Sequence, residues 1–523
     1  MRGKWYAGLA VIVLAVVLIL VMIDKAIWIL FIAIPFVLLW IYDVLQKEHT
    51  ILRNFPVLGH SRYILEFFRP EIQQYFIADN ESERPFNREI RSIIYERAKN
   101  VRDTVPFGTE REITSVGYTW VLHSLQPKHV SEVEPRIIVG GPDCKKPYSA
   151  SRLNISAMSF GSLSPRAIMA LNKGAQLGGF AHNTGEGGLS PYHLQGGDII
   201  FQIGTAYFSC RDEDGNFDEG EFKKEANRPE VKMIEIKLSQ GAKPSHGGIL
   251  PAVKLTREIA TVRKVKMGHD VISPPAHTAF DSAKGLLQFV KKLRDITGGK
   301  PVGFKLCVGR REEFLSICKA MLDTGILPDF ITVDGAEGGT GAAPLEYTNR
   351  VGEPLESALI FVHNALVGIN VRDKIRVICS GKVATGYDMV SKIAMGADMC
   401  NAARAMMMAT GCIQSKQCNA NTCPTGVATQ NKRLQRGLVV DVKKHRVANF
   451  HNNTVKSFLE MVGAMGLCNP SDLKPEYLMR RISEESVKSF REIYDYLEPG
   501  QLLGKNIPES YKRYWDRAHP DSF

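Results

Sequence analysis

Three cysteines lie close together in one turn-rich stretch, Gly411 to Gln430. Cys412, Cys418 and Cys423 follow the spacing C-x5-C-x4-C, and Pro424 comes directly after the third. Thiolates this close in sequence lose little loop entropy when they gather around a small metal centre. Structural zinc and cubane iron–sulfur clusters normally take four protein ligands, whereas three thiolates suit a cluster that lacks one iron, or a four-iron cluster with a distant fourth ligand. Three buried or free thiols without a metal are an alternative of equal weight.

The composition narrows the class of protein. Of 523 residues, 44% are hydrophobic and 23% are charged, which is typical of a packed globular chain. The formal net charge of +11 favours a membrane surface or anionic substrates, because no long basic run or nucleic-acid motif is present and no nucleic-acid partner is expected. Ten cysteines in a chain of this length indicate reduced thiols rather than a disulfide scaffold.

Two apolar runs lie near the start of the chain. The first extends from Trp5 to Ile23 and the second from Ala26 to Tyr42, with the pair Asp24-Lys25 between them. Each is roughly long enough for a transmembrane helix, and the excess of Arg and Lys on the outer flanks places both ends in the cytoplasm. We therefore predict a transmembrane helical hairpin over residues 1–45. It would anchor the protein in the lipid bilayer of the inner (cytoplasmic) membrane, with the catalytic domain facing the cytoplasm. A buried hydrophobic hairpin is the alternative.

The elements that would position the cysteines begin near residue 150, where short β-rich runs alternate with longer helical runs. Eight strands with helical crossovers predict an α/β fold, a closed (β/α)8 TIM-type barrel over residues 150–430. Residues 46–149 are expected to form a linker or docking region, and residues 431–523 a C-terminal helical extension. The expected strands are Leu153–Met158, Gly179–His182, Met233–Leu238, Asp270–Ile272, Gly303–Cys307, Phe330–Val333, Arg376–Cys379 and Asp398–Asn401.

In such a barrel, chemistry is carried by the loops that follow the strands, and here those loops are rich in glycine and polar residues. Glycine lets backbone N–H groups approach an anion closely. Two inward-facing lysines, Lys237 and Lys305, would stabilise a carboxylate or an anionic reduced ring. Loops after the last two strands of this fold often bind phosphate. The candidates for that site are Ser380, Gly381, Ala402 and Ala403.

Several motifs occur in a fixed order along this part of the chain. They are SAMSFG from Ser156, NTGEGG from Asn183, QGAKP from Gln240, ISPP from Ile272, Lys305-Leu306, GGTGAAP from Gly338 and the cysteine stretch. Together they resemble the flavin-binding synthase domain of glutamate synthase, over about half of the chain. A hairpin followed by this domain is similar to a short, membrane-anchored branch of that family without a glutaminase domain.

The resemblance implies FMN in the barrel and a 3Fe-4S cluster on Cys412, Cys418 and Cys423. It also implies that Lys305 holds and polarises an oxo acid and that Glu186 lies near the flavin and the reacting centre. The FMN contacts implied by the resemblance are Ala157, Met158, Ser159, Asn183, Thr184, Lys237, Gln240, Ser380, Gly381, Lys382, Asn401, Ala402 and Ala403.

The reaction implied by the resemblance converts 2-oxoglutarate and ammonia, through 2-iminoglutarate, into L-glutamate. Ammonia would come from solution or from a partner, and electrons from ferredoxin or a partner flavoprotein. Some loops differ from the family pattern, with Ala336-Glu337 in place of His-Asp and Ser380-Gly381-Lys382 in place of Asp-Gly-Gly. Two alternatives therefore stay open: a membrane-linked FMN oxidoreductase for another small amino or oxo acid, and a non-catalytic electron-transfer or scaffold subunit.

Overall fold

The computed structural model describes residues 13–19, 26–101, 104–130 and 135–523. The chain forms two compact units, one over residues 1–88 and the other over residues 89–523. The second unit contains the barrel and all residues of the predicted site.

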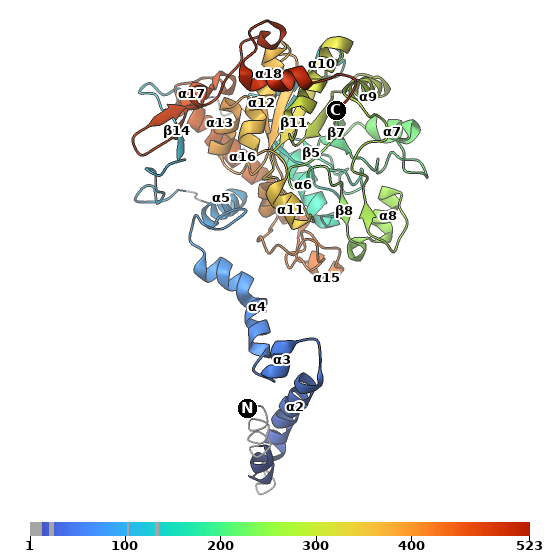
Figure 1. The fold of residues 1–523 in the computed structure, drawn as a ribbon, viewed down its shortest axis with the longest axis vertical. Coiled ribbons are helices and arrows are strands. Elements are labelled where there is room, and N and C mark those ends of the chain that lie inside the picture. Colours follow the sequence, from blue (N-terminus) through green and yellow to red (C-terminus); the bar gives the residue numbers. More distant parts are fainter. Residues whose placement is uncertain (1–12, 20–25, 102–103, 131–134) are drawn as a thin grey trace. The chain divides into compact units, whose positions relative to one another are not determined.

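Eight parallel strands close into a barrel in the order β4-β5-β6-β7-β10-β11-β12-β13 (Figure 1). The ring closes where Cys400 of β13 pairs with Leu153 of β4. Strands such as β10 and β11 are buried along their whole length, which is why they read as nearly continuous apolar runs. The predicted α/β barrel is confirmed. The strands are β4 (Leu153–Ile155), β5 (His182–Asn183), β6 (Ile199–Ile203), β7 (Val231–Lys237), β10 (Val302–Leu306), β11 (Phe330–Asp334), β12 (Arg376–Ser380) and β13 (Met399–Ala402).

Helices follow most of the strands and cover the outside of the barrel (Figure 1). Short polar side chains begin several of them: Ser164 accepts from the Ala167 amide at 3.2 Å, and Thr385 forms a capping box with Asp388. The helices are α6 (Pro165–Gly178), α7 (Glu219–Ala226), α8 (Arg257–Arg263), α9 (Ala283–Ile296), α10 (Arg311–Thr324), α11 (Leu345–Arg350), α12 (Leu355–Gly368), α13 (Gly386–Ala394) and α14 (Arg404–Ala409).

A β-hairpin closes the end of the barrel where the strands begin. It consists of β2 (Ile137–Val139) and β3 (Tyr148–Ala150), which pair antiparallel. Their inward side chains form one hydrophobic cluster with residues near the starts of the barrel strands, including Met233, Phe330 and Met399. The opposite end of the barrel, where the strands finish, is left to the loops.

One predicted barrel strand is wrong and one barrel strand was missed. The predicted strand at Asp270–Ile272 is β9 (Val271–Ile272), which pairs antiparallel with β8 (Ile249–Leu250) outside the barrel. The eighth strand of the ring is instead β6, between β5 and β7, and β7 pairs directly with β10. Residues 184–198 connect β5 to β6 without a helix, so the alternation of strands and helices is broken there.

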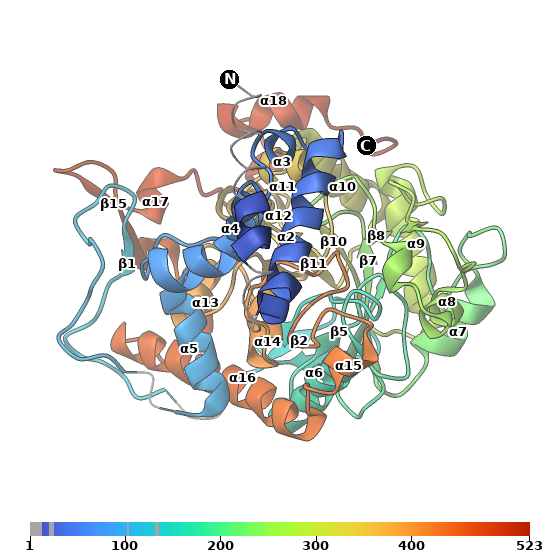
Figure 2. The ribbon, with the colours of Figure 1, turned by 90° about the horizontal axis from the view of Figure 1, so that it is seen from below.

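The C-terminal part contains helices, as predicted, and also strands that were not predicted. The long helix α16 (Val440–Ala464) packs along α6 and α13, as both views show (Figures 1 and 2). Strand β14 (Leu478–Arg481) pairs with β1 (Thr119–Val121) and with β15 (Val487–Ser489). The remaining helices are α15 (Lys432–Gln435), α17 (Phe490–Ile493) and α18 (Glu509–Arg517), and α5 (Arg88–Lys99) precedes the barrel in sequence.

The predicted transmembrane hairpin is not supported. Residues 1–12 and 20–25 lie outside the described residues, and of the first apolar run the structure describes residues 13–19, which are helical. The second run is α2 (Ala26–Leu45), which contains Pro35 and carries a buried carboxylate, Asp43, near its end. Asp43 accepts from the Val57 amide at 2.8 Å and lies 2.9 Å from His60 Nε2.

Across the residues for which the structure gives a conformation, no helix combines the length and the apolar character needed to cross a membrane. This finding overturns the predicted location at the cytoplasmic membrane and the lipid bilayer as a partner. After α2, the unit over residues 1–88 contains α3 (Thr50–Asn54) and α4 (His60–Ile72). Helix α4 continues into the π-helical turn η1 (Gln73–Ile77).

Candidate active site

The loops at the ends of the barrel strands enclose a cavity of about 160 Å³. Its walls come from the loops after β4, β5, β7, β12 and β13, from the glycine-rich loop after β11, and from the cysteine stretch. This is the end of the fold at which (β/α)8 enzymes carry out chemistry. The predicted site residues that line it are Ala157, Met158, Ser159, Glu186, Lys237, Gln240, Lys305, Ser380, Ala403 and Cys418.

The other predicted site residues lie around the cavity without lining it. Asn183, Asn401 and Ala402 are buried in barrel strands, and Thr184 is buried directly after β5. Gly381 and Lys382 follow β12, and the Lys382 side chain is exposed.

Backbone packing brings two of the predicted flavin loops together. Gly185 has a φ of +65°, and a Cβ added there would lie 2.8 Å from the backbone nitrogen of Ser159. The loop after β5 therefore needs glycine to approach the loop after β4 so closely. This approach places Glu186 and Ser159 on the wall of one cavity.

The two predicted groups Glu186 and Lys237 form an ion pair in which Lys237 is buried and Glu186 is partly buried. Lys237 Nζ lies 2.8 Å from Glu186 Oε2 and also donates to Gln240 Oε1 at 2.6 Å. Burial alone would raise the pKa of Glu186, but the nearby cations Lys237, Lys243 and Arg263 hold that pKa below its ordinary value. Glu186 is therefore a carboxylate at neutral pH, placed in the cavity wall.

Lys305 has a partner that the sequence analysis did not name. Its Nζ lies 3.2 Å from Asp334 Oδ2, at the end of the neighbouring strand β11. Burial favours the neutral amine, but Asp334 and Glu235 outweigh it, so the pKa of Lys305 is raised above its ordinary value. Asp334 Oδ2 also accepts from the Gly241 amide at 2.9 Å. Lys305 is thus held as an ammonium in the cavity.

Three further cations line the cavity and were missed as site residues. Lys243 belongs to the QGAKP motif and donates to the Ala342 carbonyl at 2.9 Å, whereas Arg404 lies directly after the predicted Ala403. Arg263 comes from α8, outside every motif, and no sequence signal pointed to it. Burial lowers the pKa of Lys243 to about 8 and that of Arg263 to about 10.

A buried polar layer lies inside the barrel beneath the cavity. The Glu235 carboxylate on β7 accepts from Asn183 Nδ2 at 2.7 Å, from Gln202 Nε2 at 2.6 Å and from Thr332 Oγ1 at 2.7 Å. The three donors come from β5, β6 and β11, and Glu235 itself lies on β7, so the layer links four strands. Asn401 Oδ1 is also buried and, among the described residues, has no hydrogen-bond partner.

The cysteine stretch forms part of the cavity wall. Cys412 and Cys423 are buried, and Cys418 is half-buried and lines the cavity. Burial raises the pKa of the Cys412 thiol to about 12, and the charges of Cys418 and Cys423 add to this effect. The Gln414 amide donates to Cys412 Sγ at 3.4 Å. In the part of the chain that the structure describes, no three His, Cys, Asp or Glu side chains are gathered as metal ligands.

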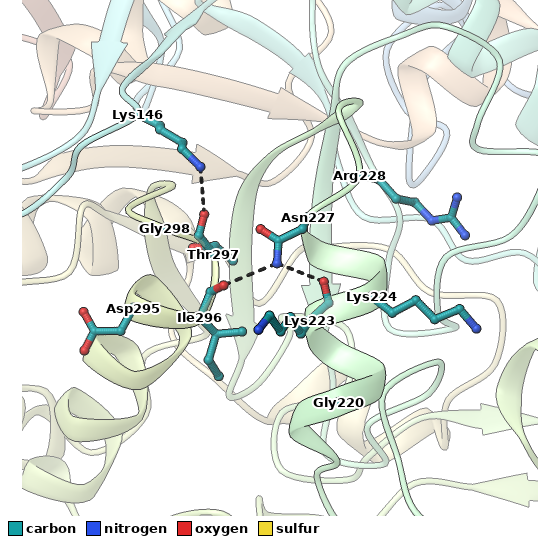
Figure 3. Close-up of a pocket in the computed structure, with 10 residues that line it drawn as sticks. All are labelled: Lys146, Gly220, Lys223, Lys224, Asn227, Arg228, Asp295, Ile296, Thr297 and Gly298. Carbon is teal, nitrogen blue, oxygen red and sulfur yellow. Dashed lines mark hydrogen bonds between the residues drawn. The ribbon is translucent and has the colours of Figure 1, made fainter.

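A second, more open hollow lies at the other end of the barrel, between the last residues of α7 and α9 and just before the first residues of β7 and β10 (Figure 3). Although several lysines line it, its polar groups are used to hold helix ends. Lys146 Nζ donates to the Thr297 carbonyl at 3.2 Å, and Asn227 Nδ2 donates to the carbonyls of Lys223 and Ile296 (Figure 3). Residues at this end of such barrels serve stability.

Comparisons with known proteins agree with the barrel and its motifs. The family described as "Conserved region in glutamate synthase" matches residues 122–468. Glutamate synthase large subunit-like protein YerD of Bacillus subtilis (strain 168) is 38% identical over 501 residues, which are 87% of this chain and 95% of YerD. Archaeal glutamate synthase (NADPH) of Methanocaldococcus jannaschii is 34% identical over 322 residues, which are 61% of this chain and 60% of that protein.

Among solved structures, a mandelate oxidase mutant with benzaldehyde has a TM-score of 0.43 and 14% identity, covering 76% of this chain and 98% of that one. The match over residues 122–468 and the identity to YerD show that the chain belongs to the glutamate synthase family and is a glutamate synthase-like oxidoreductase.

Proposed function

We propose that this chain makes L-glutamate from 2-oxoglutarate and ammonia. The observation that carries the proposal is the ring of cations around the Glu186 carboxylate in the cavity at the ends of the barrel strands. A dianionic substrate and a phosphate-bearing cofactor both need such cations in a site shielded from water. Membership of the glutamate synthase family supports this choice among anionic substrates.

The residues present fit FMN as the cofactor. Backbone groups of the loop at Ala157 and Met158 and the glycine loop at residues 339–341 line the cavity, where a flat ring could approach the main chain. Ser380 and Ala403 line the side where phosphate is expected. Lys237 and Gln240 would contact the ring. When bound, FMN supplies the hydride for the reduction.

The cavity cations divide into two groups by their existing partners. Lys237 and Lys305 are each paired with a carboxylate, Glu186 and Asp334, whereas Lys243 donates to a backbone carbonyl and no carboxylate of the described residues is paired with it. We assign the substrate carboxylates to Lys243 together with Arg263, and the oxo group to Lys305, whose ammonium polarises the carbonyl as ammonia attacks.

Glu186 is the group proposed to move protons. Its carboxylate Oε2 accepts a proton from ammonium, which frees ammonia to attack the oxo carbon; loss of water then gives 2-iminoglutarate. Addition of a hydride at that carbon and a proton at nitrogen yields L-glutamate. The ion pair with Lys237 keeps Glu186 ionised before the reaction, so that it can act as the base.

The three cysteines are proposed to bind a 3Fe-4S cluster that receives single electrons. Three thiols of one loop influence one another electrostatically, and Cys418 faces the same cavity as the flavin loops. The donor would be ferredoxin or a partner flavoprotein, and ammonia would come from solution or a partner. Cys412 and Cys423 would complete the ligand set.

Two of the side chains that depart from the family pattern, Glu337 and Lys382, do not line the cavity, whereas Ser380, in place of Asp, does. Glu337 Oε2 accepts from the Leu355 amide at 3.0 Å and so begins α12, and its carbonyl accepts from Arg404 Nη2 at 2.6 Å. The Lys382 side chain is exposed and does not line the cavity. The change to Ser380 therefore alters the cavity wall, at the side proposed for phosphate, whereas the changes to Glu337 and Lys382 do not.

The test uses purified protein with its cofactors, reduced with a limiting amount of dithionite in the absence of oxygen. The oxidised flavin absorbance should return when 2-oxoglutarate and ammonium are added together, and not with either alone. No return with this pair would reject the substrates. Bleaching of the oxidised flavin by an amino acid other than glutamate would favour the alternative of amino-acid oxidation, and absence of flavin would favour the scaffold alternative.

A further inference from the structure

We propose that Lys254 is a positioning residue that holds the cysteine stretch and places a fixed positive charge beside Cys418. This inference rests on the proposed cluster at the three cysteines. Lys254 ends the short helix η2 (Ala252–Lys254), in the segment between β8 and α8, and its side chain is only 2% exposed. No motif singled out this lysine.

The ammonium of Lys254 contacts three carbonyl groups from two different segments. Nζ donates to the Ser162 carbonyl at 2.7 Å, to the Cys418 carbonyl at 3.1 Å and to the Ala428 carbonyl at 3.3 Å. Ser162 lies in the loop after β4, whereas Cys418 and Ala428 lie in and after the cysteine trio. Lys254 therefore joins the proposed cluster loop to the proposed flavin loop.

The link continues to the flavin side through neighbouring serines. Ser159 Oγ lies 3.0 Å from Ser162 Oγ, and Ser162 Oγ donates to the Ser159 carbonyl at 2.8 Å. Ser159 and Cys418 both line the cavity. A change in the position of Lys254 would therefore shift both the loop that carries Ser159 and the stretch that carries Cys418.

The charge of Lys254 has no carboxylate partner. In the described part of the chain, no Asp or Glu oxygen lies within ion-pair distance of its Nζ. A buried ammonium without a counter-ion is costly, so its retention calls for a negative group that compensates it. Burial lowers the pKa of Lys254 to about 8, and negative charge on Cys418 or Cys423 opposes that shift and favours the ammonium. A thiolate-bound cluster would provide that negative charge permanently.

Neutral hydrogen bonds also hold this stretch, so the fold does not depend on Lys254 alone. Asn421 Nδ2 donates to the Val253 carbonyl at 3.1 Å, and Gln430 Nε2 donates to the carbonyls of Gly161 and Leu163. Lys254 adds a charge to a loop that is already tied down. Because reduction makes the cluster more negative, a fixed cation next to a ligand residue stabilises the reduced state and raises the reduction potential.

The test is a redox titration of the cluster followed by electron paramagnetic resonance, on wild-type protein and three variants. Lys254→Met removes the charge and keeps most of the stem, and Lys254→Arg keeps the charge. Lys266→Met, which removes an exposed lysine in the connection between α8 and β9, is the control. At the wild-type midpoint potential, Lys254→Met should show at least a tenfold lower ratio of reduced to oxidised cluster, a shift of about 59 mV for one electron. Lys254→Arg and Lys266→Met should stay within threefold of wild type.

Iron and sulfide contents, measured on the same samples, cover the case in which a variant does not retain the cluster. Loss of iron from Lys254→Met but not from Lys254→Arg, with unchanged circular dichroism, would support the positioning role. Equal midpoints for wild type and Lys254→Met, or the same defect in Lys254→Arg as in Lys254→Met, would overturn it. Wild-type protein without any cluster would overturn both this inference and the cluster in the proposed function. Failure to make glutamate would overturn only the proposed reaction and would leave this inference standing.

Discussion

Lys237 Nζ lies 2.8 Å from Glu186 Oε2, and both side chains form the wall of the cavity at the ends of the barrel strands. The pair joins the loop after β5 to the last residue of β7. A carboxylate that is ionised at neutral pH and lines the cavity can accept a proton from a bound ammonium. This relationship gives the first prediction.

Replacing Glu186 with Gln should lower the rate of glutamate formation by roughly 100-fold or more, because general-base catalysis contributes factors of that order. Flavin content should stay near that of wild type, since the amide keeps the size of the side chain. The measurement is glutamate produced from 2-oxoglutarate and ammonium with a chemical reductant. Glu219→Gln, an exposed change on α7, is the control. An unchanged rate in Glu186→Gln would remove Glu186 from the mechanism.

Lys243 gives a prediction about substrate affinity. Removing a charged hydrogen-bond donor costs about 1.5–3 kcal/mol, so Lys243→Met should raise the KM for 2-oxoglutarate by roughly ten- to a hundredfold. The KM for ammonium should change much less, because ammonium carries no carboxylate. Lys264→Met, on the exposed end of α8, provides the matched control. Equal effects on both KM values would contradict the assignment of a substrate carboxylate to Lys243.

The same lysine predicts a pH dependence. Burial lowers the pKa of Lys243 to about 8. Below that pH the ammonium attracts the substrate carboxylate, and above it the neutral amine does not, so the KM for 2-oxoglutarate should rise as the pH passes about 8. In Lys243→Arg the charge persists, and the rise should disappear. A wild-type KM that stays constant from pH 7 to 9 would show that another group binds the carboxylate.

The buried Glu235 gives a prediction about stability. Its two oxygens accept from Asn183, Gln202 and Thr332, so Glu235→Leu would leave the buried amides of Asn183 and Gln202 without their acceptor. A buried donor without an acceptor costs about 1–3 kcal/mol, and the free energy of unfolding should fall by about that amount. Urea denaturation followed by circular dichroism measures the change. Stability equal to that of wild type would mean that the network rearranges without cost.

Cys418 gives a prediction about electron entry. Cys418→Ser should abolish the reduction of flavin by an external one-electron donor, because the proposed cluster loses a thiolate ligand. Flavin binding should remain largely intact. The rate of flavin bleaching after mixing with reduced ferredoxin or reduced methyl viologen provides the measurement, and Cys468→Ser, an exposed cysteine, is the control. Full donor-dependent activity in Cys418→Ser would contradict the cluster assignment.

The sequence predicted those parts of the fold in which strands and helices alternate. The apolar runs at residues 302–306, 330–334 and 376–380 could be read as barrel strands because helices separate them. It failed at Ile199–Ile203, where the connection from β5 contains no helix, and at Val271–Ile272, where a local antiparallel pair imitates a barrel strand. Periodicity alone cannot tell these cases apart.

The candidate site also contains residues that the sequence could predict and residues that it could not. Glu186 could be predicted as a cavity residue because it lies in an ordered motif after a strand, and Lys237 and Lys305 because they face inward from predicted strands. Arg263 could not be predicted, because it reaches the cavity from α8 through tertiary packing. Asp334 follows the same pattern: only the pairing of neighbouring strands shows that it holds Lys305. The predicted membrane hairpin is not supported, because no helix among the described residues has the length and apolar character needed to cross a membrane.

The most direct test of the proposed reaction follows the nitrogen atom. Purified protein with its cofactors is supplied with dithionite, 2-oxoglutarate and ¹⁵N-labelled ammonium under anaerobic conditions, and the products are analysed by mass spectrometry. We expect ¹⁵N-labelled L-glutamate in wild type, one molecule for every two electrons consumed, and strongly reduced formation in Lys305→Met. If flavin-containing wild-type protein forms no labelled glutamate under these conditions, the proposed function is wrong.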